Sequence, residues 1–178
     1  MIYIFEGLDN VGKGTQISNL KRYLEERGEV VHVLHYSNIK GNNIEERSRI
    51  YYHQMFQLMK FAINNGINLI LDRAHGGETV YSPIYRNYSG DYVYEIENNF
   101  NSRITSTAKL IVFIDDPNSL IKREDGLSFS VELEKKQNEV DRFTEFYEKS
   151  NIKNKFLINI KDKLIEQVWE ELKNGLQI

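Results

Sequence analysis

The sequence contains no cysteine, only two prolines and no long apolar run. The absence of cysteine excludes disulfides and thiolate metal sites, and it suits a protein of the reducing cytoplasm. No apolar stretch approaches the roughly 18 residues that a membrane-spanning helix needs, and the first residues resemble a strand more than a signal peptide. We therefore expect a cytoplasmic protein without a membrane partner.

The charge balance excludes another class of partner. The formal net charge of the 178 residues is −3, so the chain lacks the positive excess that holds a nucleic-acid backbone. We expect no nucleic-acid partner, and a homodimer is left open. Hydrophobic residues make up 40% and charged residues 28% of the chain, a composition typical of globular proteins. The length and the absence of any linker or repeat predict one domain over residues 1–178.

The N-terminal segment carries the most specific motif. Ile2–Phe5 is a short apolar run typical of a buried parallel strand. Gly7, Gly12 and Lys13 follow at the spacing Gly-x-x-x-x-Gly-Lys of a P-loop. In such a loop, converging backbone N–H groups, a lysine charge and the positive end of a helix dipole bind phosphate. The motif predicts a phosphate site at this loop.

One position departs from this motif. The residue after the lysine, normally Ser or Thr, is Gly14, and a hydroxyl follows only at Thr15. A chance glycine-rich turn is the alternative, but strand, loop and the helical pattern of Ile17, Leu20 and Leu24 arrive in the required order. We predict that the phosphates of a nucleotide are bound by loop residues Gly7, Asn10, Val11, Gly12, Lys13, Gly14 and Thr15.

Apolar runs and helical patterns alternate along the rest of the chain. The predicted strands are Ile2–Phe5, Val30–His35, Ile67–Leu71, Lys109–Asp115 and Phe156–Ile160. Helical patterns occupy about residues 16–27, 45–64, 93–104, 116–123, 137–147 and 164–172. Residues 75–91, rich in glycine, are predicted as a loop, and residues 126–129 as a mobile one. The alternation predicts an α/β fold: a five-stranded parallel sheet with helices on both faces.

Polar residues follow the predicted strands at one edge of the sheet. Asp72 and Arg73 follow the third strand, and the loop Tyr36–Gly41 follows the second. Ligands of open parallel sheets bind at this edge. Asp72 is predicted to act on Mg²⁺ directly or through water, with Thr15 as the second metal-binding residue. A surface ion pair is the alternative for Asp72 and Arg73.

Three segments resemble thymidylate kinases and, more loosely, other nucleoside monophosphate kinases. Phe5–Gln16 resembles their P-loop. Within it, the sequence Gly-Lys-Gly-Thr-Gln matches the one found in adenylate kinases. Leu71–Arg73, with Tyr81 nine residues after the aspartate, resembles the Asp-Arg-Tyr loop, and Ile121–Tyr147 resembles the lid region. The resemblance implies a P-loop kinase fold, ATP and Mg²⁺ as cofactors, and a small nucleotide substrate. It implies phosphoryl transfer to a nucleoside 5′-monophosphate, such as the pyrimidine deoxynucleotide dTMP.

The same resemblance implies roles for single residues. Lys13 would bind the donor β- and γ-phosphates, Arg73 the acceptor phosphate, and Asp9 the 3′-hydroxyl of the acceptor sugar. An ordinary turn carboxylate is the alternative for Asp9. Some thymidylate kinases have an arginine after this carboxylate, but here it is Asn10. The lid would then supply the catalytic cation.

The predicted lid covers about residues 121–131. It begins with Lys122 and Arg123, of which Arg123 is the catalytic candidate. A solvated helix end is the alternative for both. Arg142 is a weaker candidate, because it also fits an ordinary charged helix face.

Base recognition is the least defined part of the site. With Gly66 aligned to the family's glycine before the third strand, the thymine-reading arginine falls on Tyr52, which puts thymidine specificity in question. Tyr52 and Phe56 could stack on a base, but their helical spacing favours core packing. Further substrate-binding candidates are Arg49, Tyr81 and Arg86.

Two rival functions remain open. A deoxynucleoside kinase needs a base to deprotonate a 5′-hydroxyl, and the related family places a glutamate just after the second strand. Here His35–Asn38 contains no carboxylate, and the next is Glu45. A regulatory nucleotide-binding module is the other rival, but Asn159–Asp162 has the letters of the GTPase guanine motif in the wrong order. The four histidines show no metal-ligand spacing and are predicted to be structural or on the surface: His32, His35, His53 and His75.

Overall fold

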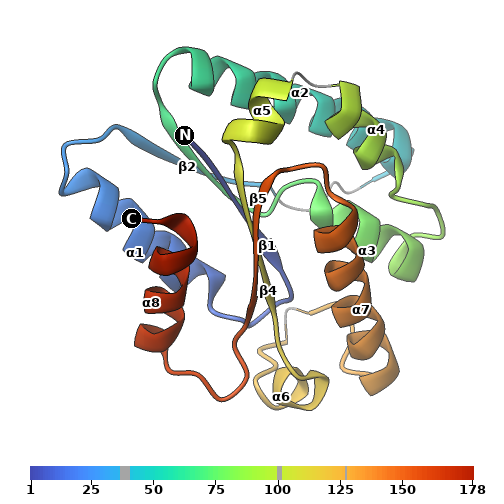
Figure 1. Ribbon diagram of the computed structural model, residues 1–178. Coiled ribbons are helices and arrows are strands. Elements are labelled where there is room, and N and C mark those ends of the chain that lie inside the picture. The colour runs from blue at the N-terminus through green and yellow to red at the C-terminus, as the bar shows by residue number, and fades with distance from the viewer. Residues whose placement is uncertain (37–40, 100–101, 127) are drawn as a thin grey trace.

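The computed structural model describes residues 1–36, 41–99, 102–126 and 128–178 (Figure 1). The strands are β1 (Ile2–Gly7), β2 (Val31–His35), β3 (Asn68–Asp72), β4 (Lys109–Ile114) and β5 (Asn154–Asn159). The helices are α1 (Lys13–Glu25), α2 (Ile44–Asn64), α3 (Gly76–Tyr85), α4 (Tyr92–Asn99), α5 (Ser102–Thr107), α6 (Pro117–Lys122), α7 (Leu133–Lys149) and α8 (Ile165–Leu176).

The five strands form one parallel sheet in the order β2-β3-β1-β4-β5. α1 and α8 cover one face, and α2, α3 and α7 cover the other (Figure 1). The predicted fold class is therefore confirmed. β1 lies at the centre, where the chain reverses its direction across the sheet, and ligands bind at such a switch point. In the part of the chain that the structure describes, no helix has the length and apolarity that crossing a bilayer requires.

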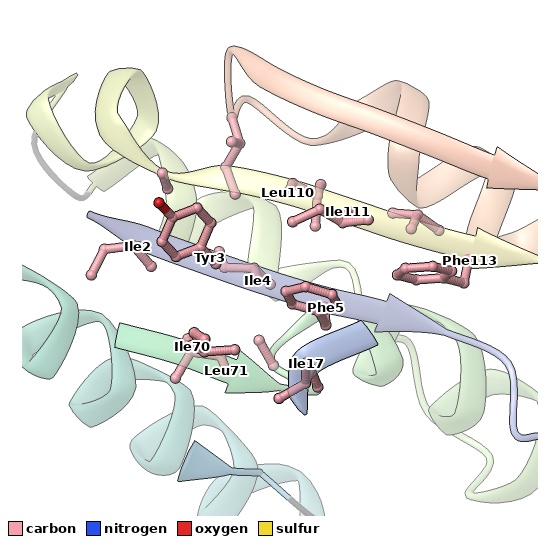
Figure 2. Close-up of a cluster of buried hydrophobic side chains, with 14 of the residues drawn as sticks. Ile2, Tyr3, Ile4, Phe5, Ile17, Ile70, Leu71, Leu110, Ile111 and Phe113 are labelled. Carbon is pink, nitrogen blue, oxygen red and sulfur yellow. The ribbon is translucent and has the colours of Figure 1, made fainter. Parts of the chain in front are cut away.

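β1 is buried along its whole length. Figure 2 shows its side chains packed with those of β3, β4 and Ile17 of α1. The rings of Phe5 and Phe113 stack with centroids 5.8 Å apart. Burying each side chain of this size contributes about 1.5–3 kcal/mol to the free energy of folding. The packing of β1 therefore fixes the position of the loop that follows it.

The predicted loop over residues 75–91 is wrong in its first half, which forms α3. Gly76 and Gly77 suggested a loop because glycine disfavours helices. The side chain of Glu6, from β1, accepts hydrogen bonds from backbone N–H groups at the start of this helix. This acceptor comes from a distant part of the sequence, so the local pattern does not reveal it.

Pro83 lies inside α3. Its ring nitrogen cannot donate to the carbonyl one turn earlier, that of Thr79. Arg142 of α7 donates a hydrogen bond to this carbonyl instead, at 3.4 Å. The side chain of Arg142 thus joins two helices.

The helical pattern predicted over residues 93–104 is divided between α4 and α5. Phe100, one of its apolar positions, lies outside the described residues. So do residues 37–40 of the loop after β2, and Leu127 of the segment predicted to be mobile and to form a lid.

Candidate functional site

The loop between β1 and α1 has a backbone that requires glycine. Gly7 has a φ of 127°, and a Cβ atom there would lie 2.1 Å from the carbonyl oxygen of Phe113. Only glycine permits so close an approach. Asn10 and Gly12 also have positive φ angles, of 58° and 74°, and the chain then enters α1 at Lys13. The loop therefore leaves β1 in a tight turn against Phe113 of β4.

The N-terminus of α1 points its N–H groups toward this loop. The helix has no side-chain cap and no acidic residue in its first turn. N–H groups of a first helical turn lack intrahelical acceptors, and the helix dipole adds positive potential. Gly14 and Thr15 of this turn are exposed. These residues fit the phosphates of a nucleotide.

Lys13 lies inside the loop, and only 7% of its surface is exposed. Its ammonium group donates hydrogen bonds to the carbonyl oxygens of Gly7, at 3.0 Å, and Leu8. Burial lowers the pKa of Lys13 to about 7, and the nearby Arg73 also lowers it. The carboxylates that oppose this shift are Asp9, Asp72 and Glu6. Lys13 thus lies among the charges that end β1 and β3.

Arg73 lies beside the loop because β3 pairs with β1. Phe5 is in register with Asp72, and Arg73 follows in the left-handed region, with a φ of 66°. Its guanidinium forms an ion pair with the Asp9 carboxylate. The structure therefore brings together three residues that the sequence singled out: Asp9, Lys13 and Arg73.

Asp72 has a partner that the sequence did not reveal. Nδ1 of His35 lies 2.8 Å from Oδ2 of Asp72, because these residues are in register at the ends of β2 and β3. The sequence placed both residues at the carboxyl ends of predicted strands. It did not show that these two strands are neighbours in the sheet.

Asp72 and Thr15 provide oxygen ligands, the kind that Mg²⁺ prefers. This ion usually takes one or two carboxylates, substrate phosphates and several waters. The carboxylate of Asp72 is 26% exposed at the sheet edge, and the Thr15 hydroxyl lies in the exposed first turn of α1. The two residues fit such an ion.

Tyr81 lies near both Arg73 and Asp9. It is a buried residue of α3. Burial lowers the pKa of Arg73, but Tyr81 and Asp9 raise it by more. The Tyr81 ring lies 5.4 Å from the ring of Phe129, which in turn stacks on Tyr85 at 4.9 Å. The segment predicted as a lid therefore contacts α3 through an aromatic residue.

Arg123 occupies the end of α6. Its guanidinium pairs with the buried carboxylate of Asp115, the residue after β4. This partner was not among the sequence candidates. The neighbouring Lys122 is exposed. Arg123 thus lies at the same edge of the sheet as Arg73, but it is paired with Asp115.

The base-recognition candidates of α2 differ in their exposure. Tyr52 and Phe56 are buried, with 7% and 0% exposure, as core packing predicts. Arg49 is exposed, pairs with Glu45 at 2.8 Å, and lies 4.0 Å above the ring of Tyr92. It lines a surface pocket between α2 and α4.

Arg86 belongs to a buried polar cluster. It donates a hydrogen bond to Glu78 at 3.0 Å, and the same carboxylate accepts hydrogen bonds from the hydroxyls of Tyr88 and Tyr92. Burial and the Glu78 charge raise the pKa of Tyr52. Tyr52 therefore borders this cluster, which the sequence did not predict.

The parallel sheet, its P-loop and the Asp-Arg pair at the next strand define the fold of the P-loop kinases. Solved structures match it over almost the whole chain. The thymidylate kinase from Ehrlichia chaffeensis has a TM-score of 0.68 and 17% identity, covering 99% of this chain and 98% of that one. The deoxyadenosine kinase from M. mycoides with bound dCTP has a TM-score of 0.60 and 16% identity, covering 99% of both chains.

The sequence itself resembles thymidylate kinases. It is 27% identical over 161 residues to the thymidylate kinase of Chlorobaculum tepidum, covering 80% of this chain and 74% of that protein. The thymidylate kinase of Chlorobaculum parvum is 26% identical over 172 residues, covering 84% and 78%. No family model matches the chain. Sequence and fold together support a nucleotide kinase.

Proposed function

We propose that residues 1–178 form one kinase domain that transfers the γ-phosphoryl group of ATP to a nucleoside 5′-monophosphate. A pyrimidine deoxynucleotide such as dTMP is the proposed acceptor. The observation that carries the proposal is the position of Arg73, paired with Asp9 beside Lys13. A cation from the loop after β1 and a cation from the turn after the neighbouring β3 meet there, as transfer between two phosphates requires.

The roles follow from the chemistry of phosphoryl transfer, which depends on positioning and charge neutralisation. Lys13 and the first amides of α1 bind the donor β- and γ-phosphates. The guanidinium fork of Arg73 binds the acceptor phosphate through two parallel hydrogen bonds. Asp9 accepts a hydrogen bond from the 3′-hydroxyl of the acceptor, and Tyr81 borders the same sugar.

The remaining candidates complete the proposed site. Thr15 and Asp72 hold Mg²⁺, which when bound neutralises phosphate charge. Arg123 is the proposed lid cation, and it would have to exchange Asp115 for a phosphate. Arg49 and Tyr52 are the proposed base-recognition residues of α2.

A deoxynucleoside kinase is the second candidate, favoured by the similar fold of the deoxyadenosine kinase. That reaction needs a carboxylate base after β2. The first carboxylate in that part of the sequence is Glu45, which pairs with Arg49. A monophosphate acceptor needs no such base, because its phosphate is already anionic. A non-catalytic nucleotide-binding module gives no reason for a cation at Arg73.

A phosphoryl-transfer screen tests the proposal. The protein is incubated with ATP, Mg²⁺ and each nucleoside or nucleoside 5′-monophosphate, and the products are separated by charge. We expect a diphosphate product from at least one pyrimidine deoxynucleotide. Phosphorylation of nucleosides alone would favour the second candidate, and no transfer to any acceptor would favour the binding module.

A further inference from the structure

Glu6 is a fully buried carboxylate on the central strand, directly before the P-loop, and its exposure is 0%. Its Oε1 atom accepts hydrogen bonds from three backbone N–H groups. The donors are Ala74 at 2.9 Å, Gly76 at 2.7 Å and Gly77 at 3.3 Å. These amides belong to the residue after Arg73 and to the first two residues of α3, so a side chain of β1 fixes the backbone that follows Arg73.

The preceding residue of β1 holds Arg73 itself. The N–H group of Arg73 donates a hydrogen bond to the carbonyl oxygen of Phe5 at 2.9 Å. Consecutive residues of β1 thus bind consecutive residues of the turn. Arg73 has a left-handed φ of 66°, which an arginine adopts only where its surroundings determine it. Phe5 and Glu6 provide these surroundings.

Gly76 shows how closely the carboxylate fits the turn. A Cβ atom at this position would lie 2.9 Å from Oε1 of Glu6 and 2.5 Å from the ring of Phe146. A larger residue would separate the turn from the carboxylate. The contact therefore depends on a glycine in the turn as well as on the glutamate.

The second carboxylate oxygen offers a sharp test. Oε2 of Glu6 is buried and has no hydrogen-bond partner in the described ranges. A glutamine at this position keeps the Oε1 acceptor and breaks no described hydrogen bond of Oε2. Burial raises the pKa of Glu6, while the charges of His75 and Arg73 oppose this shift.

We infer that Glu6 is a positioning residue that holds Arg73 in place for the acceptor phosphate by accepting the amide hydrogen bonds of Ala74, Gly76 and Gly77. Glu6 is buried beneath the turn and acts through Arg73. The inference rests on the proposed function, in which Arg73 binds that phosphate. It predicts a defect specific to the acceptor.

The test compares Glu6→Ala with Glu6→Gln. Losing a hydrogen bond to a charged group shifts a conformational equilibrium by roughly tenfold or more, and Arg73 would be displaced with the turn. We expect Glu6→Ala to raise the KM for the monophosphate about tenfold and the KM for ATP less than about twofold. Glu6→Gln keeps the acceptor atom, so its KM for the monophosphate should stay within about threefold of the wild type. Ile4→Ala, a buried apolar residue two positions earlier on the same strand, is the matched control for lost stability.

An unchanged ratio of the two KM values in Glu6→Ala would overturn the inference. So would the same change of ratio in Ile4→Ala, or an equal defect in Glu6→Gln. If Glu6→Ala does not fold, Gly76→Ala is the second test, because its Cβ atom displaces the turn from the carboxylate. A folded Gly76→Ala variant with an unchanged ratio would likewise overturn the inference.

Amide hydrogen exchange separates this inference from the proposed function, because it needs no substrate. We expect exchange of the Ala74, Gly76 and Gly77 amides to be faster in Glu6→Ala and unchanged in Glu6→Gln, relative to global stability. A wild type that phosphorylates no monophosphate would refute the proposed function. Slow exchange retained in Glu6→Ala would refute the positioning role, whatever the activity.

Discussion

Asp9 and Arg73 form an ion pair between the P-loop and the end of β3, although they are 64 residues apart in the sequence. The two side chains are only 21% and 24% exposed, so each is partly shielded from water and neutralises the other. In the proposed reaction both bind the acceptor, Arg73 its phosphate and Asp9 its sugar. When the acceptor binds, the ion pair between Asp9 and Arg73 is replaced by contacts of Arg73 with the phosphate and of Asp9 with the sugar.

Replacement of Lys13 tests the donor site. Lys13→Ala should lower kcat by roughly 10²–10³-fold, the usual effect of removing one preorganised donor to the transition state, about 2.7–4 kcal/mol. Its ammonium group bonds to loop carbonyls, so circular dichroism should show an intact fold. Turnover above about a tenth of the wild-type value would contradict the P-loop assignment.

Replacement of Arg73 tests the acceptor site. Arg73→Ala should raise the KM for the monophosphate far more than the KM for ATP, because only the acceptor phosphate loses its partner. Arg73→Lys should recover only part of the affinity, since an ammonium group lacks the guanidinium fork. Steady-state kinetics with each substrate varied in turn measures both effects. Equal changes in the two KM values would argue against this role.

Asp72→Asn tests the proposed metal site. The amide keeps the size of the side chain but removes the charge, so turnover should fall strongly at limiting Mg²⁺ and recover in part at high Mg²⁺. Thr15→Ser should have a mild effect, because it keeps the hydroxyl. His35→Ala is the control for the 2.8 Å contact with Asp72. Wild-type activity of Asp72→Asn at limiting metal would show that this carboxylate is structural.

The pH dependence of ATP binding tests the environment of Lys13. Its pKa falls from 10.5 to about 7, so the free protein loses this charge as the pH rises through 7, and ATP affinity should fall. Binding at about pH 8 should take up a proton, because phosphate favours the charged form. Titration calorimetry in buffers of different ionisation enthalpy measures this uptake. Lys13→Arg stays charged and should show none.

The lowered pKa of Lys13 also affects stability. The unfolded chain binds this proton up to a pKa near 10.5 and the folded chain only up to about 7. The contribution of Lys13 to stability therefore rises with pH between these values. Urea unfolding of the wild type and Lys13→Met across this range should show the difference. A parallel pH dependence of the two proteins would contradict it.

The sheet could be predicted from the sequence because its strands are short apolar runs, and the three central ones, β1, β3 and β4, are largely buried. β3 was expected at Ile67–Leu71 and lies at Asn68–Asp72, a shift of one residue that leaves Arg73 at its end. The P-loop was recognisable because its glycines and lysine are close together in the chain.

The rest depends on contacts between distant residues. α3 was missed because its start is fixed by Glu6, which is 70 residues from Gly76. The pairing of His35 with Asp72 requires the strand order, and that of Arg123 with Asp115 requires the turn after β4. Local sequence patterns reveal neither the strand order nor this turn.

β1 carries both halves of the proposed site on one uninterrupted stretch of chain. Phe5 and Glu6 hold the acceptor side through the turn after β3, and Gly7 opens the loop that leads to Lys13. The number of residues from Phe5 to Lys13 therefore sets the distance between the proposed acceptor site and the proposed donor site. Insertions and deletions should therefore be tolerated poorly in this stretch.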